Sequence, residues 1–116
     1  MTIRELYKAI GGDYEDIRRR MPSDSMIEQF LLRFPADTSY AAMQNARKRH
    51  DPEGAFLAAH TLKGVAAALG LKELTVAVSL LADALRPPSP LPDNALFDAV
   101  AAAYDRVIRH IAAFPR

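Results

Sequence analysis

Apolar residues recur every three to four positions along this chain, and proline or glycine interrupts the pattern at short intervals. This spacing is typical of amphipathic helices, which place one apolar face against a core. No stretch alternates apolar and polar residues for long enough to predict a β-strand. The expected helical segments are residues 2–10, 13–21, 25–34, 37–50, 52–69, 71–86 and 94–114. The sequence therefore predicts an all-α protein.

The ends of these segments carry residues that start and stop helices. The expected N-caps, whose side-chain oxygens accept from backbone N–H groups, are Thr2, Ser25, Asp37, Asp51 and Asp93. Gly70 is expected to end one helix just before the next begins, which predicts an antiparallel hairpin. Four longer helices with short links predict an antiparallel four-helix bundle. We expect one domain over 1–116, with short N-terminal cap segments in 1–22 packed on a helical bundle in 24–113.

Composition excludes several classes of protein. A length of 116 residues suits a single core, and a formal net charge of +1 gives no overall field that favours nucleic acid. The absence of cysteine excludes disulfides, thiol catalysis and thiolate metal sites. The N-terminus lacks the apolar segment of a signal peptide, and no uncharged run approaches the roughly 20 residues of a membrane span. We therefore expect a cytoplasmic protein with neither nucleic acid nor membrane as partner.

The helix expected over 52–69 places a histidine outside its apolar face. At about 100° per residue, one side of this helix collects Ala55, Ala58, Leu62, Val65, Ala66 and Leu69. His60 points almost opposite to that side. Its neighbours on the outer face, one or two turns away, are Phe56, Leu57, Lys63, Gly64 and Ala67. The sequence therefore predicts an exposed imidazole among apolar residues, a cation and a glycine.

These neighbours suit a nucleophilic imidazole. An unperturbed imidazole titrates near about pH 6.5, so a useful fraction is neutral at neutral pH. Lys63 can place an ammonium beside an anion carried by the ring. Glycine costs up to about 1 kcal/mol relative to alanine inside a helix, so Gly64 indicates a need for space. Phe56, Leu57 and Ala67 form an apolar surround for docking. The face predicts a histidine that accepts an anionic group from another macromolecule.

The motif "AHTLKG" at 59–64, followed by "LG" at the hairpin, resembles the histidine-containing phosphotransfer (HPt) domain of bacterial multistep phosphorelays. The resemblance extends from the N-terminal segments to about Arg86. It implies that a phospho-aspartyl receiver domain of a response regulator or hybrid kinase phosphorylates His60 on a ring nitrogen. Lys63 would then balance the phosphoryl charge, and Gly64 would give steric clearance. It also implies that this chain holds no metal or cofactor, since the receiver carries Mg²⁺ and the acidic pocket.

One position departs from the pattern of some family members. They place a glutamine on the helix after the hairpin, where it bonds to the active imidazole and fixes its orientation. The corresponding position here holds Ala82, and the nearest polar residue, Ser79, falls on the outer side of its helix. The orientation of the His60 ring is therefore expected to depend on water or on the partner.

The other polar and aromatic groups have structural interpretations. His50 and His110 are expected to be surface residues. A metal site is not expected, because no two histidines are four residues apart and no carboxylate lies one turn from His60. The basic runs 18–20 and 47–50 lie at helix ends, which disfavours DNA binding. The residues expected in the core rather than in a docking surface are Phe30, Leu31, Phe34 and Tyr40.

The sequence therefore predicts a phosphoryl carrier that is not itself an enzyme, because the partner receiver supplies the transfer chemistry. His60 would accept the phosphoryl group from one receiver and pass it to another or back. The alternative is a four-helix-bundle interaction module without phosphotransfer, which would bind its partner regardless of His60. A helix-turn-helix regulator is a further alternative, but no recognition helix with a row of basic residues is present.

Overall fold

The computed structural model describes residues 1–115, and within that range every regular element is a helix. The elements are α1 Ile3–Ala9, α2 Tyr14–Arg20, α3 Asp24–Leu31, the short 3₁₀ helix η1 Phe34–Ala36, α4 Ser39–Lys48, α5 Pro52–Ala68, α6 Lys72–Leu85 and α7 Asn94–Ala113. No strand occurs among the described residues, so the predicted all-α class is confirmed.

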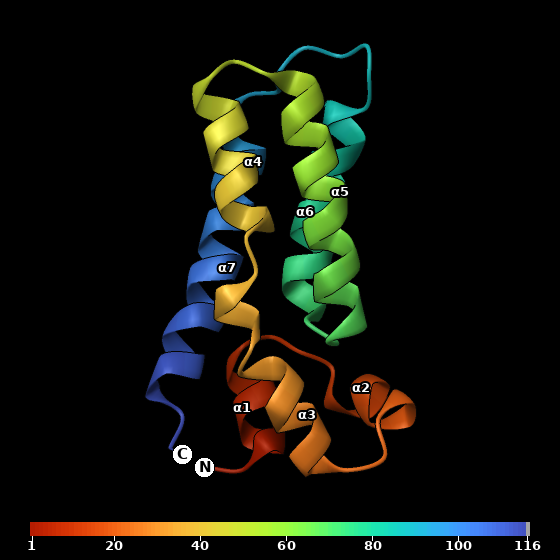
Figure 1. Ribbon diagram of the computed structural model, residues 1–116, viewed down its shortest axis with the longest axis vertical. Coiled ribbons are helices and arrows are strands. Elements are labelled where there is room, and N and C mark those ends of the chain that lie inside the picture. Colours follow the sequence, from red (N-terminus) through yellow and green to blue (C-terminus); the bar gives the residue numbers. More distant parts are fainter. Residues whose placement is uncertain (116) are drawn as a thin grey trace.

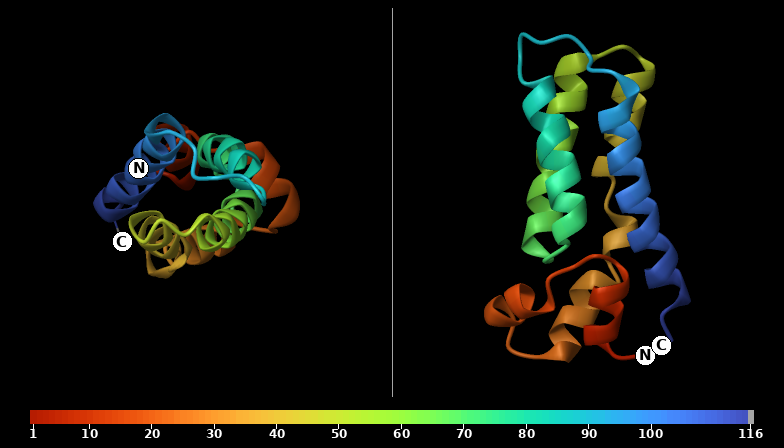
Figure 2. Two further views of the ribbon diagram at one scale, coloured as in Figure 1. Left: turned by 90° about the horizontal axis from the view of Figure 1, so that it is seen from above. Right: turned by 180° about the vertical axis from the view of Figure 1, so that it is seen from behind.

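The four longest helices, α4 to α7, form an antiparallel bundle, and the N-terminal helices pack across one end of it (Figure 1). A view along the bundle shows the four helices arranged around a common centre (Figure 2). The predicted four-helix bundle with N-terminal segments packed on it is therefore confirmed.

One expectation about this division needs correction. We expected residues 24–113 to form the bundle, but α3 lies beside α1 and α2 below it (Figure 1). The physical reason is Pro35 in η1, which separates α3 from α4 because proline cannot continue the hydrogen bonding of a helix. The chain therefore changes direction there, and α3 packs Ile27 and Leu31 into the core from the end of the bundle.

The observed caps match the predictions at three helices and differ at two. Thr2 forms a capping box with Glu5, and the carboxylates of Asp51 and Asp93 cap α5 and α7. The N-cap of α3 is Ser23 rather than Ser25, because the helix already begins at Asp24. Asp37 ends η1 and accepts from the backbone N–H of Ser39 at 2.9 Å, so it precedes the actual N-cap of α4 by one residue.

Gly70 makes the turn between α5 and α6, as predicted. Its φ of +68° lies in the left-handed region, which glycine adopts without strain. A Cβ at this position would lie 3.0 Å from Cβ of Ile17 and 3.2 Å from the carbonyl oxygen of Asp13. The backbone N–H of Asp13 also donates to the carbonyl of Gly70 at 2.8 Å. The hairpin is thus in direct contact with the segment that begins α2.

The N-terminal helices bind the carbonyl groups at the end of α5. The Tyr7 hydroxyl, which is buried, donates to the carbonyl of Leu69 at 2.7 Å. The Arg20 guanidinium donates to the carbonyls of Ala67 and Ala68 at 2.9 and 3.1 Å. The last carbonyls of a helix have no partner within the helix. Residues of α1 and α2 supply those partners here and hold the C-terminal end of α5 in place.

The buried face of α5 is made mainly of small residues. Ala55, Ala59, Leu62 and Ala66 are fully buried, whereas Ala58 and Val65, which we expected in the core, are half-buried. The core face is therefore rotated toward Ala59 relative to the prediction. The rotation arises because α4 and α6 pack on the two sides of α5. The sequence of α5 alone does not indicate where those two helices lie.

We expect Tyr7→Phe to lower the free energy of unfolding by about 1–3 kcal/mol, because it leaves the Leu69 carbonyl buried without a donor. Burial raises the pKa of Tyr7, so the native state holds this proton more tightly than the unfolded chain does. The stability that depends on this proton is complete below about pH 10 and is lost as the pH rises above it. Urea unfolding of both proteins from pH 7 to 11 measures this effect. An equal loss in the parent and the variant would contradict it.

Candidate functional site

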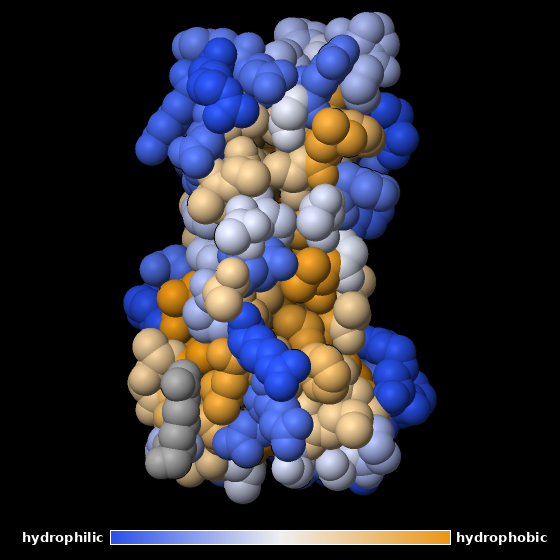
Figure 3. Space-filling model, viewed as in Figure 1, coloured by the Kyte–Doolittle hydropathy of each residue, from blue (hydrophilic) through white to orange (hydrophobic). Residues whose placement is uncertain are grey.

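His60 lies near the middle of α5, and its side chain is exposed on the outer face of the bundle, as predicted. Gly64 and Ala67 are also exposed, and Leu57 keeps 65% of its surface accessible. Hydrophobic side chains line the surface along α5 on the face turned to the viewer (Figure 3). The structure therefore brings an accessible imidazole and apolar neighbours together on one surface.

The His60 ring packs against Phe56, one turn earlier on the same helix. The two ring centroids are 6.1 Å apart, and the ring planes differ by 24°. Phe56 is half-buried, and Cζ of Arg86, at the end of α6, lies 5.6 Å from its ring centroid. Aromatic rings attract cations above their faces, which explains the position of Arg86, whereas His60 packs ring against ring. That water or a partner orients the imidazole stays a prediction, and Phe56 is the aromatic ring that the same helix places beside it.

Neither residue of α6 that we compared with the family's glutamine approaches the imidazole as a donor. Ala82 is buried and contributes to the core. Ser79 is half-buried, and its hydroxyl donates to the carbonyl of Thr75 at 2.6 Å within its own helix. Among residues 1–115, no hydrogen bond reaches the ring of His60. Its two nitrogens are therefore open to an incoming group.

Lys63 lies one turn after His60 and is half-buried. Lys63 forms no ion pair with any described residue. Each ion pair found among those residues joins an acidic side chain to an arginine. Its ammonium is thus available to a negative group on the neighbouring ring. An ammonium on a flexible stem can follow such a group as it binds.

Gly64 has no structural reason to be glycine. A Cβ added at this position would meet no atom within 4 Å, and its φ lies outside the left-handed region. The contrast with Gly54 on the same helix is clear, because a Cβ there would lie 2.3 Å from Oδ2 of Asp51. An alanine at Gly64 would fit the fold and favour the helix. The missing side chain therefore leaves a gap in the outer surface one turn from His60.

Two arginines that contribute to this region have no signal in the sequence pattern. Arg86 contacts Phe56 from the far end of α6, and Arg20 donates to the backbone of Ala67 from α2. Both lie more than 20 residues from His60 along the chain. Arg20 belongs to the basic run 18–20, whose sequence position indicates only a helix end. Their roles depend on tertiary contacts that no local spacing indicates.

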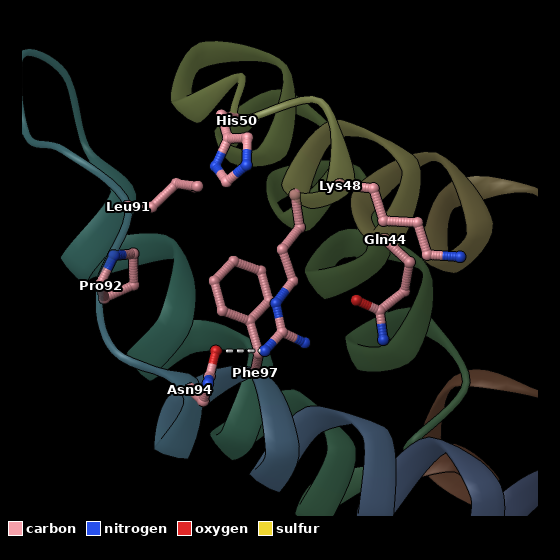
Figure 4. A pocket seen from close by; sticks show the side chains of 8 residues that line it. Gln44, Lys48, His50, Leu91, Pro92, Asn94 and Phe97 are labelled. Carbon is pink, nitrogen blue, oxygen red and sulfur yellow. Dashed lines mark hydrogen bonds between the residues drawn. The ribbon is translucent and has the colours of Figure 1, made fainter.

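The other two histidines lie outside this site. His110 is half-buried, and its Nδ1 is 2.7 Å from the carbonyl oxygen of Arg106 in the same helix. His50 is exposed, but it follows α4 with a φ of +57° rather than lying in the last helical turn as expected. It faces a hollow of about 430 Å³ between α4 and α7, where Arg47 binds Asn94 (Figure 4). No residue lining that hollow comes from α5 or α6.

The four residues predicted to lie in the core after residue 29 fall into two groups. Leu31 and Phe34 are buried, and Tyr40 is half-buried and stacks on Tyr104 with centroids 3.8 Å apart. Phe30 is 44% exposed, contrary to expectation, because it lies on the outer side of α3 with Cζ of Arg33 5.6 Å from its ring.

No group of three histidine, cysteine or acidic side chains within residues 1–115 is arranged to hold a metal ion. Across the same residues, no helix combines the length and the apolar character that crossing a membrane requires.

Comparison with known proteins agrees with the geometry of this face. The family model of the Hpt domain matches residues 25–110, which include α4 to α6, most of α7 and the whole His60 face. No curated protein and no solved structure matches the chain. Hpt domains take part in histidine phosphotransfer in phosphorelays with receiver domains, and they are phosphocarrier modules rather than catalysts. Because the match covers well over half of its length, the chain belongs to the Hpt domain family.

Proposed function

We propose that His60 is the phosphoryl acceptor and donor of this domain. The observation that carries the proposal is the exposed imidazole of His60, which lies one turn from a glycine that the fold does not require and from the Lys63 ammonium, which forms no ion pair within residues 1–115. A receiver domain with a phosphorylated aspartate is the donor, and the same or a second receiver is the acceptor.

The transfer step follows from the chemistry of the two groups. The lone pair of an unprotonated ring nitrogen of His60 attacks phosphorus and forms an N–P bond. The bond between phosphorus and the aspartyl oxygen breaks, and the aspartate leaves as a carboxylate. The other ring nitrogen keeps its proton, so the product is a phosphoramidate on His60. The reverse sequence delivers the group to a receiver. The receiver supplies Mg²⁺ and the acidic pocket, and this chain supplies no cofactor.

The neighbours of His60 have distinct roles in this proposal. Lys63 balances the charge of the phosphoryl group, and Phe56 keeps the imidazole in a fixed orientation by packing along the ring. Gly64 leaves room for the receiver to approach. Phe56, Leu57 and Ala67 form the apolar surface on which the receiver docks, which fits the exposure of Leu57 and Ala67.

His60→Gln should abolish labelling by a phosphorylated receiver and leave helical content unchanged, because the side chain is exposed and holds no contact of the core. His50→Gln, which changes an exposed histidine outside the site, is the matched control and should be labelled like the parent. Mass spectrometry under alkaline conditions preserves phosphohistidine and locates it. Undiminished labelling of the His60 variant would refute the assignment and favour an interaction module without phosphotransfer.

Lys63→Ala should lower the rate of phosphoryl transfer or the lifetime of phosphohistidine by about 3- to 10-fold, since two unit charges about 4 Å apart in water interact by roughly 1 kcal/mol. Lys48→Ala removes an exposed lysine from α4 and should leave both quantities at their parent values. Quenched-flow transfer and the decay of isolated phosphoprotein measure the two quantities. Parent-like values for Lys63→Ala would exclude the charge-balancing role.

Gly64→Ala should raise the free energy of unfolding by about 0.5–1 kcal/mol, because alanine favours helix and meets no neighbour here. The same change should slow transfer from the receiver, and Gly64→Gln should block it, because a side chain then occupies the gap. Gly54→Ala on the same helix is the control and should bring no gain in stability, since its Cβ meets Asp51. Urea unfolding and transfer kinetics test both effects. Normal transfer by Gly64→Gln would disprove the clearance role.

A further inference from the structure

Two large apolar side chains of α6 point away from the core, and the described residues leave more than half of each exposed. Val76 is 55% exposed and Leu80 is 56% exposed, four residues apart on one face of the helix. This face belongs to the side of the bundle formed by α6 and α7, which is turned to the viewer in the right panel of Figure 2. His60 lies on α5, whose outer surface is turned to the viewer in Figure 1. Val76 and Lys72 also line a hollow of about 260 Å³ with Ala67, so this face adjoins the C-terminal end of the surface proposed for the receiver.

A groove lies directly beside this pair. It has a volume of about 560 Å³ and lies where α6, α7 and the turn after α1 meet. Its lining residues are Gly11, Gly12, Lys72, Glu73, Val76, Ala77, Leu80 and Ala99. The floor and walls include two glycines and two alanines, so the groove has room for a side chain of the size of leucine. The surface therefore presents both a projecting leucine and a hollow of suitable size.

The charged residues of the same face occupy its two ends with opposite signs. Lys72 is exposed at the start of α6, and Asp83 is exposed near its end. The charged pair Lys72 and Asp83 and the apolar pair Val76 and Leu80 share nearly the same centre along α6. Their midpoints are half a residue apart, which is less than about 1 Å along a helix. A face with this pattern is complementary to a copy of itself turned by 180°.

We propose that this face binds a second copy of the chain, with the two α6 helices antiparallel about a two-fold axis near residue 78. A two-fold contact uses the same surface of both subunits, so each contact occurs twice. Residue 80 of one copy then faces residues 75–76 of the other, which places each Leu80 over the groove beside the other Val76. Lys72 of each copy faces Asp83 of the other.

The remaining charges around the groove do not oppose this pairing. Glu73 is bound to Arg106 at 2.7 Å within the same chain, so this pair brings no net charge to the interface. Asp83 is 3.5 Å from Arg86 in an exposed ion pair. Exposed pairs of this kind are weak, so Asp83 can turn to a lysine of the second copy. His60 does not line the groove, and the proposal does not depend on phosphotransfer.

The contact is about one helix pair wide, which is small compared with the roughly 1,200–2,000 Å² buried in stable complexes. We therefore expect reversible association that becomes visible between about 10 μM and 1 mM. Sedimentation equilibrium of the full chain should show an average mass that rises from one copy toward two over this range. An average mass equal to that of the monomer at every concentration would overturn the proposal.

Substitution of the projecting leucine tests the location of the contact. Leu80→Gln should weaken association at least tenfold without loss of helical content, because the side chain is already exposed. Leu57→Gln is the matched control, since Leu57 is a comparably exposed leucine on α5, and it should associate like the parent. Equal effects of the two variants would overturn the assignment to α6.

Charge reversal tests the orientation. Lys72→Glu and Asp83→Lys should each weaken association several-fold, because each places like charges opposite one another twice. The double variant restores opposite charges in the antiparallel pairing and should associate like the parent. Both changes suit the helix dipole, since they move a negative charge to the start of α6 and a positive charge to its end. A double variant as weak as the sum of the single variants would overturn the two-fold arrangement.

Discussion

The last carbonyl groups of α5 are satisfied by side chains from the N-terminal helices, and the placement of the His60 surface depends on this contact. Tyr7 and Arg20 donate to the backbone of Ala67, Ala68 and Leu69, just before the turn at Gly70. Without the Tyr7 hydroxyl the Leu69 carbonyl would be unpaired next to the core, whereas Arg20 ties the exposed carbonyls of Ala67 and Ala68 to α2. The short N-terminal helices therefore do more than cover the bundle, because they fix the helix that carries the histidine.

The outer surface of α5 follows a different physical requirement from its inner surface. Its inner side is mostly alanine and packs between α4 and α6. Its outer side has an exposed leucine and a glycine that no internal contact explains, although both features are unfavourable for an isolated soluble helix. Such local costs are expected where a surface serves binding or chemistry. This contrast gives the Hpt domain family assignment a structural basis at the residue level.

Local sequence was sufficient wherever a short-range interaction decides the structure. The caps at Thr2, Asp51 and Asp93 are side-chain-to-backbone bonds within three residues, and the turn at Gly70 depends on its own φ. It was insufficient where distant segments compete. The position of α3 below the bundle and the exposure of Phe30 depend on packing against helices that are separate in sequence.

The sequence by itself determined the helical class, the four-helix bundle and the outward position of His60 with Lys63 and Gly64 beside it, because helical period places these residues on one face. Only the tertiary structure decided that Arg86 contacts Phe56 from α6 and that Arg20 closes the end of α5. The reason is that periodicity fixes directions within one helix. The distances between side chains of different helices depend on how the whole core packs.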